Sequence, residues 1–490
     1  MSAPTLIALA VLIPAGAIAL IAASGRIANL REAVTLVAAV ALFAVVVSLT
    51  PAVLGGQQPE LQLLQVVPGL EFGFRIEPLG MLFALIASFL WIVNSVYSIG
   101  YMRANREPRQ TMFYCCFAAA IASTIGIAFS ANLFTLFIFY ELLTLTTYPL
   151  VTHHADREAQ AAGRTYMLML LGTSIVLLLP AIMVTFAATG TLQFTAGGIL
   201  AGGHLPGALV GVLLALFAFG IGKAAIMPFH RWLPAAMVAP TPVSALLHAV
   251  AVVKAGVFCV VKVVVYVFGI DFLAGNGGGD WLVWIAGFTV LAASVIALRQ
   301  DNLKRRLAYS TISQLSYVVL AVAILTPLSA AGAALHILAH AFGKITLFFA
   351  AGAIYTAAHK TEISQLDGVG RAMPWTMAAF AVGAASMIGI PPTAGFMSKW
   401  FILGAAMDAQ SWVAIFVIVA STALNAAYFV PIVYVAFFRP LAAPEHGHHQ
   451  HGEAPWPIVL ALTVTAAGTV LLFFFPDVGL GLARQMVGGV

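Results

Sequence analysis

The sequence predicts an all-α polytopic membrane protein with about fourteen transmembrane helices. Two observations predict this class: 62% of the 490 residues are hydrophobic while 8% carry a charge, and apolar stretches long enough to cross a bilayer recur along nearly the whole chain. A water-soluble domain needs a far larger charged surface. The composition therefore excludes a soluble globular protein.

A window of about 20 residues, the length of a helix that crosses the hydrocarbon core, locates the expected spans. They cover residues 4–23, 33–54, 79–100, 112–130, 133–151, 165–188, 208–228, 243–268, 281–298, 308–325, 329–356, 376–405, 411–437 and 456–475. We expect the first span to be retained rather than cleaved as a signal peptide. No lysine or arginine precedes it, and its apolar run is too long for an h-region.

The basic residues predict the orientation of the chain. Fifteen of the 22 lysines and arginines lie in connections between an odd-numbered span and the next even-numbered one, and only Arg75 and Arg484 lie on the opposite side. By the positive-inside rule, the basic connections face the cytoplasm and both termini face outward. The net charge of +5 thus reflects membrane orientation and does not indicate nucleic-acid binding.

The other five basic residues are all lysines within expected spans: Lys223, Lys254, Lys262, Lys344 and Lys399. Lysine, unlike arginine, can give up its proton when it is buried. Glu141, in "FIFYELLTLTTYPL", is the one acid near the centre of an expected span. Because intramembrane ionisable groups are functional by default, we expect Glu141 and four of these lysines to move charge. Lys262, toward the outer end of its span, is expected to snorkel instead.

Prolines interrupt two of the expected spans. Pro228 and Pro234 follow Lys223 in "GIGKAAIMPFHRWLP", and Pro391 and Pro392 precede Lys399 in "IGIPPTAGFMSKW". Proline removes a backbone donor and clashes with the preceding turn, and irregular backbone at membrane depth is tolerated only within protein or beside water. We therefore expect the seventh and twelfth helices to be broken.

The two interrupted spans hold corresponding positions if spans 4–8 and 9–13 form two units of five. An odd number of spans per unit makes the second unit run through the membrane upside down. The expected organisation is an N-terminal three-helix segment (1–110), a first five-helix repeat (111–270), a second five-helix repeat (271–439), and a His-rich loop with the last helix (440–490).

Polar residues between the two breaks have helical spacing. His336, His340 and Lys344 stand at successive i+4 positions and so share one helix face. A second stripe contains Ser310, Ser313, Gln314 and Tyr317, for which helix packing is an equal explanation. His248 and Lys254 point roughly 120° apart on a regular helix, so both serve one path only if it runs between helices.

The sequence predicts neither a cofactor site nor a metal site. Three cysteines lie inside expected spans without the spacing of an iron–sulfur or zinc site, and we interpret them as packing residues: Cys115, Cys116 and Cys259. The cluster "EHGHHQH" at 445–451 fits a solvated loop better than a metal site. The glycine-rich "GNGGGD" precedes a span instead of following a strand, and there is no Walker loop. Any transport must then be driven by an ion gradient or by a partner.

Four blocks carry a resemblance to a known family: "YELLTLTTYPL", "GIGKAAIMPFHRWLPAAMVAPTPVSALLHAVAVVKAG", "HILAHAFGKITLF" and "IGIPPTAGFMSKW". They resemble the antiporter-like subunits shared by respiratory complex I and Mrp-type cation/proton antiporters, over roughly residues 80–440. The resemblance implies the fourteen-helix fold with two inverted repeats. It also implies proton-translocation roles: Glu141 paired with Lys223, Lys254 as the next carrier inward, a central relay of His336, His340 and Lys344, and Lys399 as the terminal site. His248 is a further candidate for proton translocation.

Within that family the chain is most similar to the D-type subunit of Mrp antiporters. Room for one helix after the thirteenth span sets it apart from the L-type subunit of complex I and from the A-type subunit of Mrp antiporters, and Lys399 stands where the M-type subunit of complex I has glutamate. The resemblance implies a prokaryotic inner membrane, other membrane subunits as partners, and transport of protons with Na+ or K+. The alternatives are a proton-pumping subunit of a complex I or hydrogenase-type translocase, a stand-alone transporter of a small solute, and a scaffold whose lysines only hold helices together.

Overall fold

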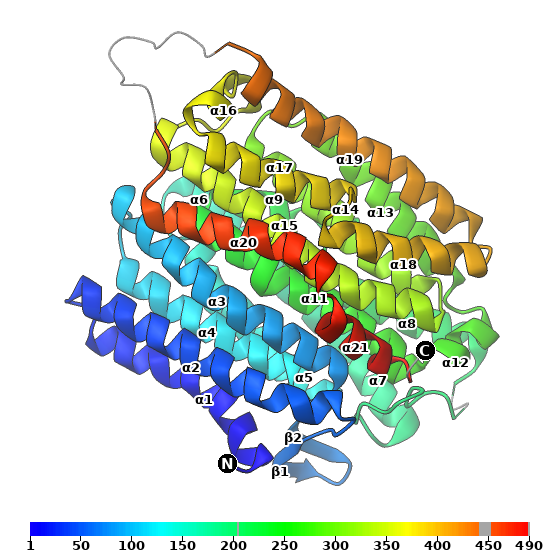
Figure 1. The fold of residues 1–490 in the computed structure, drawn as a ribbon. Coiled ribbons are helices and arrows are strands. Elements are labelled where there is room, and N and C mark those ends of the chain that lie inside the picture. The colour runs from blue at the N-terminus through cyan, green and yellow to red at the C-terminus, as the bar shows by residue number, and fades with distance from the viewer. Residues whose placement is uncertain (203–204, 441–451, 489–490) are drawn as a thin grey trace.

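The structure is a computed structural model that describes residues 1–202, 205–440 and 452–488, and most of these residues are helical (Figure 1). Among them, eleven helices are long and apolar enough to cross a membrane. The predicted polytopic all-α class is confirmed. The count of fourteen is not confirmed, because the broken spans consist of short pieces and α14 is too polar to be counted.

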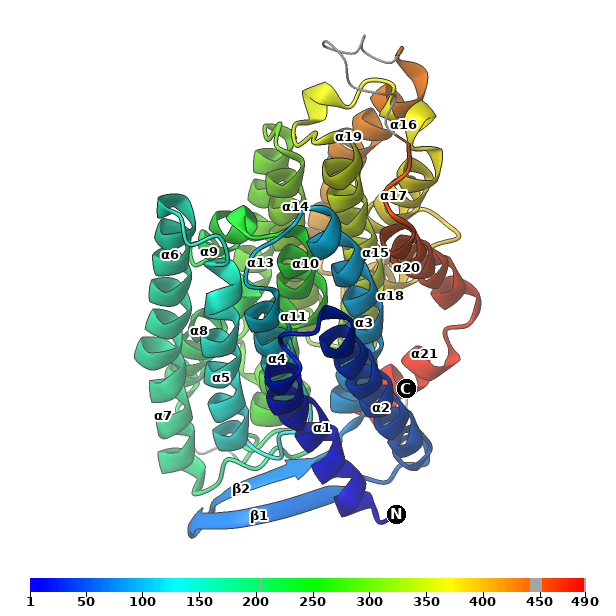
Figure 2. The ribbon, with the colours of Figure 1, turned by 90° about the vertical axis from the view of Figure 1, so that its left-hand side faces the viewer.

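The N-terminal segment contains three long helices and a small sheet that the hydropathy pattern did not predict. Its elements are α1 (Ala3–Ala23), α2 (Ala28–Leu54), β1 (Glu60–Val67), β2 (Leu70–Arg75) and α3 (Pro78–Ala104). The two strands pair antiparallel around Pro68-Gly69, a dipeptide typical of turns. This hairpin lies across one end of the helix bundle, which we call the hairpin face (Figure 2).

The middle of the chain is divided into many short elements. They are α4 (Gln110–Ala128), α5 (Leu133–Val151), α6 (Arg157–Thr173), η1 (Ser174–Leu178), α7 (Leu179–Thr189), α8 (Gly207–Gly220), η2 (Gly222–Ala224), α9 (Trp232–Ala235), η3 (Ala236–Val238), α10 (Thr241–Ala245), η4 (Leu246–Val250), α11 (Val252–Lys262), η5 (Val263–Phe268) and α12 (Ile270–Asn276). Of the η segments, η1, η4 and η5 are π-helical.

The last part of the chain is more regular. It comprises α13 (Asp280–Leu298), α14 (Leu303–Ala323), α15 (Pro327–Ala358), η6 (Ile363–Gln365), α16 (Val369–Ala372), α17 (Pro374–Ile388), α18 (Ala394–Asp408), α19 (Trp412–Phe438), α20 (Trp456–Phe474) and α21 (Asp477–Met486). The end of the bundle opposite the hairpin carries α16 and the connections that lead into α4, α6 and α14, and Arg109, Arg157 and Arg305 lie at the starts of these three helices (Figure 2). We call this end the basic face (Figure 2).

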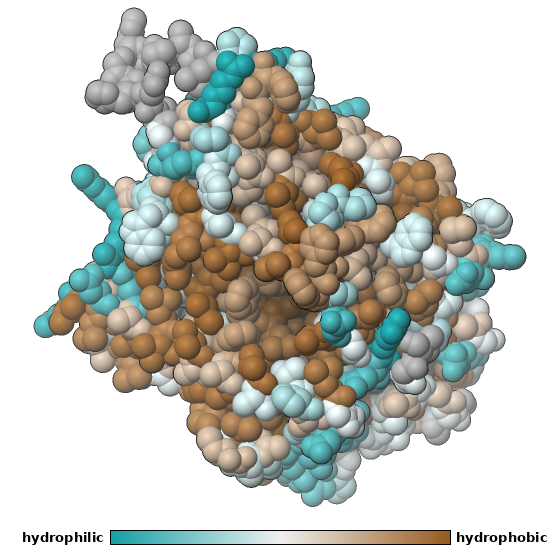
Figure 3. Space-filling model, viewed as in Figure 1, coloured by the Kyte–Doolittle hydropathy of each residue, from teal (hydrophilic) through white to brown (hydrophobic). Residues whose placement is uncertain are grey.

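Two segments occupy the centre of the bundle. All residues of the continuous stretch Thr241–Phe268 are buried, and so are 94% of the residues in an 18-residue apolar window of α15, whereas only 28% are buried in the corresponding windows of α1 and α20. The outer helices present a broad apolar surface between polar margins (Figure 3). Apolar side chains on an outer surface suit contact with lipid, whereas polar groups in a buried helix must find partners inside the protein.

Both proline-bearing spans are interrupted in the structure. The first stops at Gly220, before Pro228, and resumes only as the short α9, within which Pro234 lies. The second is interrupted between α17 and α18, and Pro391 and Pro392 occupy the gap. Residues with positive φ mark both breaks: Ala225 at 56° in the first and Gly389 at 93° in the second.

Candidate functional site

The first break places Lys223 against α5. Its Nζ donates hydrogen bonds to the carbonyl oxygen of Tyr140 (2.8 Å) and to the Oγ1 of Thr144 (2.6 Å). The same ammonium group lies 3.3 Å from the centre of the Tyr140 ring, a cation–π contact. Lys223 is completely buried. Its charge is therefore held by one face of a neighbouring helix.

Glu141 does not form the expected direct pair with Lys223. Both carboxylate oxygens are buried and have no hydrogen-bond partner among the described residues. The physical reason is helical geometry, because adjacent residues point about 100° apart and the lysine occupies the face made by Tyr140 and Thr144. The two charges still lie close enough to interact. The lysine thus contacts the segment that carries the glutamate without contacting its carboxylate.

Lys223 is also in direct contact with the next buried helix. A Cβ added to Gly256 on α11 would lie 2.3 Å from the carbonyl carbon of Lys223, so this close approach requires glycine. Two residues earlier, the Nζ of Lys254 lies 2.5 Å from the Nδ1 of His340 on α15. The first break and the centre of α15 are thereby joined through α11.

The three polar residues of α15 reach three different helices. Besides the contact of His340 with α11, the Nδ1 of His336 lies 2.9 Å from the Oγ of Ser398 on α18. The Nζ of Lys344 donates to the Oγ of Ser310 on α14 (2.8 Å). All three side chains are at most 1% exposed. Their shared helix face therefore lies at the junction of α11, α14 and α18.

The segment with His248 departs from regular helix geometry. His248 lies in the π-helical η4, and its ring is 4.7 Å from the ring of Phe348 on α15. A π-helix has more residues per turn than an α-helix, so the angle of 120° expected between His248 and Lys254 does not apply. Both side chains reach α15, while both ring nitrogens of His248 lack a partner among the described residues.

Lys399 is held by the second broken helix itself. Its Nζ donates to the carbonyl oxygens of Met387 (2.9 Å) and Ile388 (3.0 Å), the last two residues of α17. These carbonyls have no intrahelical partner and form the negative end of the helix dipole. The ammonium also lies 4.8 Å from the ring of Tyr317, which in turn stacks 5.5 Å from the ring of His336. Lys399 is thereby linked to α15.

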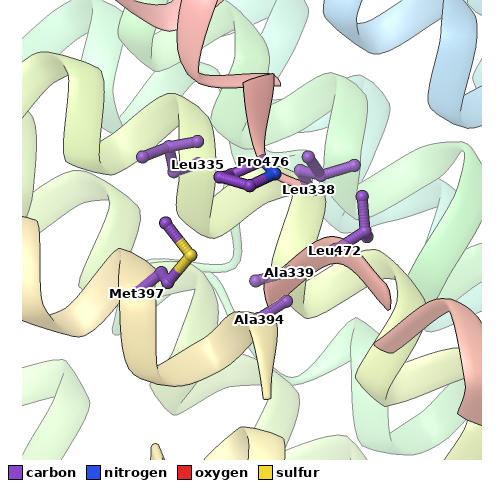
Figure 4. A pocket seen from close by; sticks show the side chains of 7 residues that line it. All are labelled: Leu335, Leu338, Ala339, Ala394, Met397, Leu472 and Pro476. Atoms are coloured by element: carbon purple, nitrogen blue, oxygen red, sulfur yellow. The ribbon is translucent and has the colours of Figure 1, made fainter. Parts of the chain in front are cut away.

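A small apolar cavity of about 20 Å³ adjoins this end of α15 (Figure 4). Leu335, Leu338 and Ala339 of α15 line it together with Ala394 and Met397 of α18, one residue of α20 and one of the turn after it. A cavity lined only by apolar groups stays dry, because water there has no hydrogen-bond partners. None of His336, His340 and Lys344 lines this cavity, so it is separate from the polar row of α15.

Lys262 does not snorkel, contrary to the sequence-based expectation. It is fully buried, lies 3.3 Å from the carboxylate of Glu77 and donates to the carbonyl oxygen of Ser130 (2.8 Å). Glu77 was missed among the candidate acids because it stands at the edge of a span rather than near its centre. The sequence did contain an indication of this residue, because Glu77 directly precedes Pro78, the first residue of α3. The N-terminus of a helix favours a negative charge.

The structure describes no metal centre. Among residues 1–202, 205–440 and 452–488, no three His, Cys, Asp or Glu side chains are grouped so that they could hold a metal ion. The His cluster at 445–451 lies outside the described residues. The buried row described above contains groups that accept and donate protons, and it includes a carboxylate only at its Glu141 end.

The chain is similar to subunits of quinone oxidoreductases and of cation/proton antiporters. The sequence profile described as "NADH:quinone oxidoreductase/Mrp antiporter, TM" matches residues 130–425. The N subunit of the NADH-quinone oxidoreductase of Desulforudis audaxviator is 31% identical over 416 residues, which are 82% of each chain. The A/B subunit of a probable K(+)/H(+) antiporter of Rhizobium meliloti is 33% identical over 344 residues, covering 69% of this chain and 33% of the relative. In the solved structures, a chain of the Mrp complex of Dietzia sp. superposes over 100% of this chain and 98% of its own length, with a TM-score of 0.84 at 20% identity.

Proposed function

The chain belongs to the NADH:quinone oxidoreductase/Mrp antiporter transmembrane family, and from this premise we propose that it translocates protons as one subunit of a larger membrane complex. Within the family, we propose the role of the D-type subunit in an Mrp-type antiporter of monovalent cations and protons. The observation that carries the proposal is the row of buried lysines and histidines that runs from the first broken helix through α11 and α15 to the second.

The proposed mechanism needs charge movement and no covalent catalysis. At an effective dielectric constant of about 20, two unit charges 4 Å apart interact by about 4 kcal/mol, and about 1.4 kcal/mol changes a protonation equilibrium tenfold. When α5 moves so that Glu141 pairs with Lys223, that lysine is held charged. When the pair opens, the charge of Lys223 acts on Lys254 through the contact between α11 and η2.

Protons then pass along the row in the order of its contacts. Lys254 exchanges a proton with His340, and His340 with its neighbours Lys344 and His336 on α15. His336 is linked to Lys399 through Ser398 and the ring of Tyr317. We propose Lys399 as the terminal site because it occupies the second break, where irregular backbone can adjoin water.

We propose the following arrangement in the membrane. Residues 111–270 and 271–439 form two inverted five-helix repeats, each with a broken fourth helix. The basic face is directed toward the cytoplasm of a prokaryotic cell, as the positive-inside rule requires, and both termini face outward. Other membrane subunits cover part of the apolar surface and lipid covers the rest, and Na+ or K+ is exchanged for protons by the whole assembly.

Replacement of Glu141 or Lys223 tests the proposal. In membrane vesicles that contain the whole complex, we expect Glu141→Ala and Lys223→Ala each to abolish cation exchange driven by a pH gradient. The amount of assembled complex, measured on native gels, should not change. A normal exchange rate in either variant contradicts the mechanism, whereas loss of the complex itself would instead support a scaffold role for these residues.

A second candidate function is a proton pump driven by a redox reaction. The match to the N subunit of a quinone oxidoreductase over 82% of both chains favours it. Vesicles separate the two candidates, because a redox pump acidifies or alkalinises the lumen only when an electron donor and a quinone are supplied. An antiporter responds to Na+ or K+ alone. Transport by the purified chain without partners would contradict both and indicate a stand-alone transporter.

A further inference from the structure

A polar pocket of about 240 Å³ opens on the basic face, and the row of buried groups does not include it. Its wall combines the end of α3 and the loop after it, the start of α10, the start of α14 and the last turns of α15. The polar side chains that line it include Tyr101, Glu107, His154, Thr241, Lys304 and Tyr355. With this size and lining, the pocket has room and hydrogen-bond partners for several water molecules.

The mouth of the pocket carries a carboxylate between two histidines. The Oε2 of Glu107 lies 3.1 Å from the Nε2 of His154 and 3.6 Å from the Nε2 of His153. Burial lowers the pKa of His153 to about 4, whereas the hydrogen bond to Glu107 raises the pKa of His154. Of the two histidines, His154 therefore binds a proton more readily, and it is also the one within hydrogen-bond distance of the carboxylate.

The floor of the pocket leads inward between α3, α10 and α15. The hydroxyl groups of Tyr101 and Thr241 are in contact there, at 3.5 Å. Just beyond them, a Cβ added to Gly352 would lie 2.0 Å from the hydroxyl oxygen of Tyr97 and 2.7 Å from the Cγ2 of Thr241. Only glycine at this position of α15 leaves room for both of these side chains beside the helix.

His248 lies at the inner end of this route. Thr241 and Ser244 lie three residues apart on α10, and His248 follows in the π-helical η4, where its ring packs 4.7 Å from the ring of Phe348 on α15. His248 is fully buried, both of its ring nitrogens lack a partner among the described residues, and its charge is close enough to interact with that of His340. A buried, unpaired imidazole between a polar pocket and a histidine of the row is placed to pass protons from one to the other.

We propose that this pocket is the proton intake of the chain, in which Glu107 and His154 collect protons at the mouth and pass them to His248. Water and the hydroxyls of Tyr101, Thr241 and Ser244 carry each proton inward by exchanging O–H and N–H bonds. His248 becomes an imidazolium and returns to the neutral form when it protonates His340. The inference rests on the proposed function, since only a chain that moves protons needs such a route.

Other charged groups face the two ends of the route. Asp156 and Lys304 act on His154, and Arg109 acts on His153. The Nζ of Lys304 donates to the carbonyl oxygen of Ala239 (2.6 Å), so this cation borders the pocket on the side of the first break. At the inner end, Lys344 and Lys304 both act on His248. A proton on His248 is thus repelled by lysine on either side and does not stay there.

A cysteine in the pocket wall tests the route directly. In the whole complex, Ala351→Cys places a thiol in the pocket, and Ala358→Cys on the same helix places one outside its lining. We expect a small methanethiosulfonate reagent, added on the basic face, to reduce proton uptake to background in the Ala351→Cys variant alone. A labelled Ala351→Cys thiol with a normal uptake rate overturns the proposal, and so does a thiol that the reagent cannot reach.

A second variant uses the pH dependence of uptake. Glu107→Gln removes the carboxylate that raises the pKa of His154, so this pKa falls toward the ordinary value of about 6.5. Because uptake needs protonated His154, the decline of the rate at high pH should move to lower pH. It should do so only when the pH on the basic face is varied. An unchanged profile, or one that follows the pH of the hairpin face, contradicts the intake.

The two proposals fail in different ways. If the native complex shows no proton-coupled transport at all, the proposed function is wrong. The intake alone is wrong if three results are obtained together. The native complex transports protons, the Lys223→Ala variant does not, and the labelled Ala351→Cys variant keeps its normal rate.

Discussion

The two broken helices hold their lysines in opposite ways. Lys223 lies in the break itself and is bound by another helix, α5, through a carbonyl oxygen and the hydroxyl of Thr144. Lys399 lies beyond its break and binds the last two carbonyl oxygens of α17, which belongs to the same interrupted span. One lysine depends on a neighbour for its partners, and the other does not.

This difference assigns different tasks to the two breaks. The negative end of the α17 dipole stabilises the charged form of Lys399 wherever the other helices lie. Lys223 loses its partners if α5 moves, and the same movement changes its distance to Glu141. We therefore infer that transport is controlled at the first break, and that the second break serves as a holding site at the end of the row.

Exchange of each lysine for arginine should give the largest effect. Arginine cannot give up its proton, so Lys223→Arg should lower the exchange rate at least about 100-fold, the equivalent of about 3 kcal/mol. Lys399→Arg keeps a cation on the α17 carbonyls and should cost about tenfold. Exchange driven by a pH gradient in vesicles measures both, and the exposed Arg305→Lys serves as the control. Equal losses at the two positions would contradict the division of tasks.

Removal of the Thr144 hydroxyl should give an intermediate effect. A hydrogen bond to a charged group contributes about 1.5–3 kcal/mol, so Thr144→Val should slow exchange about tenfold or more. Thr144→Ser should restore most of the rate. Thr146→Val, on the same helix but without contact to Lys223, should behave like the native chain. No single side-chain replacement can do the same to Lys399, because its partners are backbone carbonyls.

The smallest effects are expected on stability. Gly389 adopts a φ of 93° and a Cβ there would lie 2.9 Å from the Cδ of Lys399, so Gly389→Ala should destabilise the chain by about 1–2 kcal/mol. Ala225 in the first break has a positive φ, which glycine adopts without steric strain. Ala225→Gly should therefore stabilise the chain by less than about 1 kcal/mol. Thermal unfolding of the purified complex measures both. Gly404→Ala, with open space around its Cα, should not lower the melting temperature.

Local features of the sequence predicted much of the fold. Hydropathy located the membrane-crossing helices, and Pro228 and Pro391 lie where the two spans are interrupted. Each of these features acts within one or two turns of the chain, so a sequence pattern contains them. The hairpin was missed because the window searched only for long apolar runs, and the pattern of Leu61, Leu63 and Leu64 on β1 has no regular alternation.

The partners of the buried charges could not be predicted in the same way. Helical spacing placed His336, His340 and Lys344 on one face, but it does not specify Ser398, Lys254 and Ser310 as their contacts, because these come from distant parts of the chain. Lys262 was misjudged for the same reason, since its depth in the bundle depends on Glu77 from another helix.

The continuous helix α15 also limits which changes in chain length the protein can accept. His336, His340 and Lys344 contact three different helices from a single uninterrupted rod. Inserting or deleting one residue anywhere between Ser329 and His336 would rotate the rest of the helix by about 100° relative to its N-terminal turn. All three side chains would then leave their partners together. Homologous chains should therefore vary in the length of the connections around α15, while the number of residues within it stays the same.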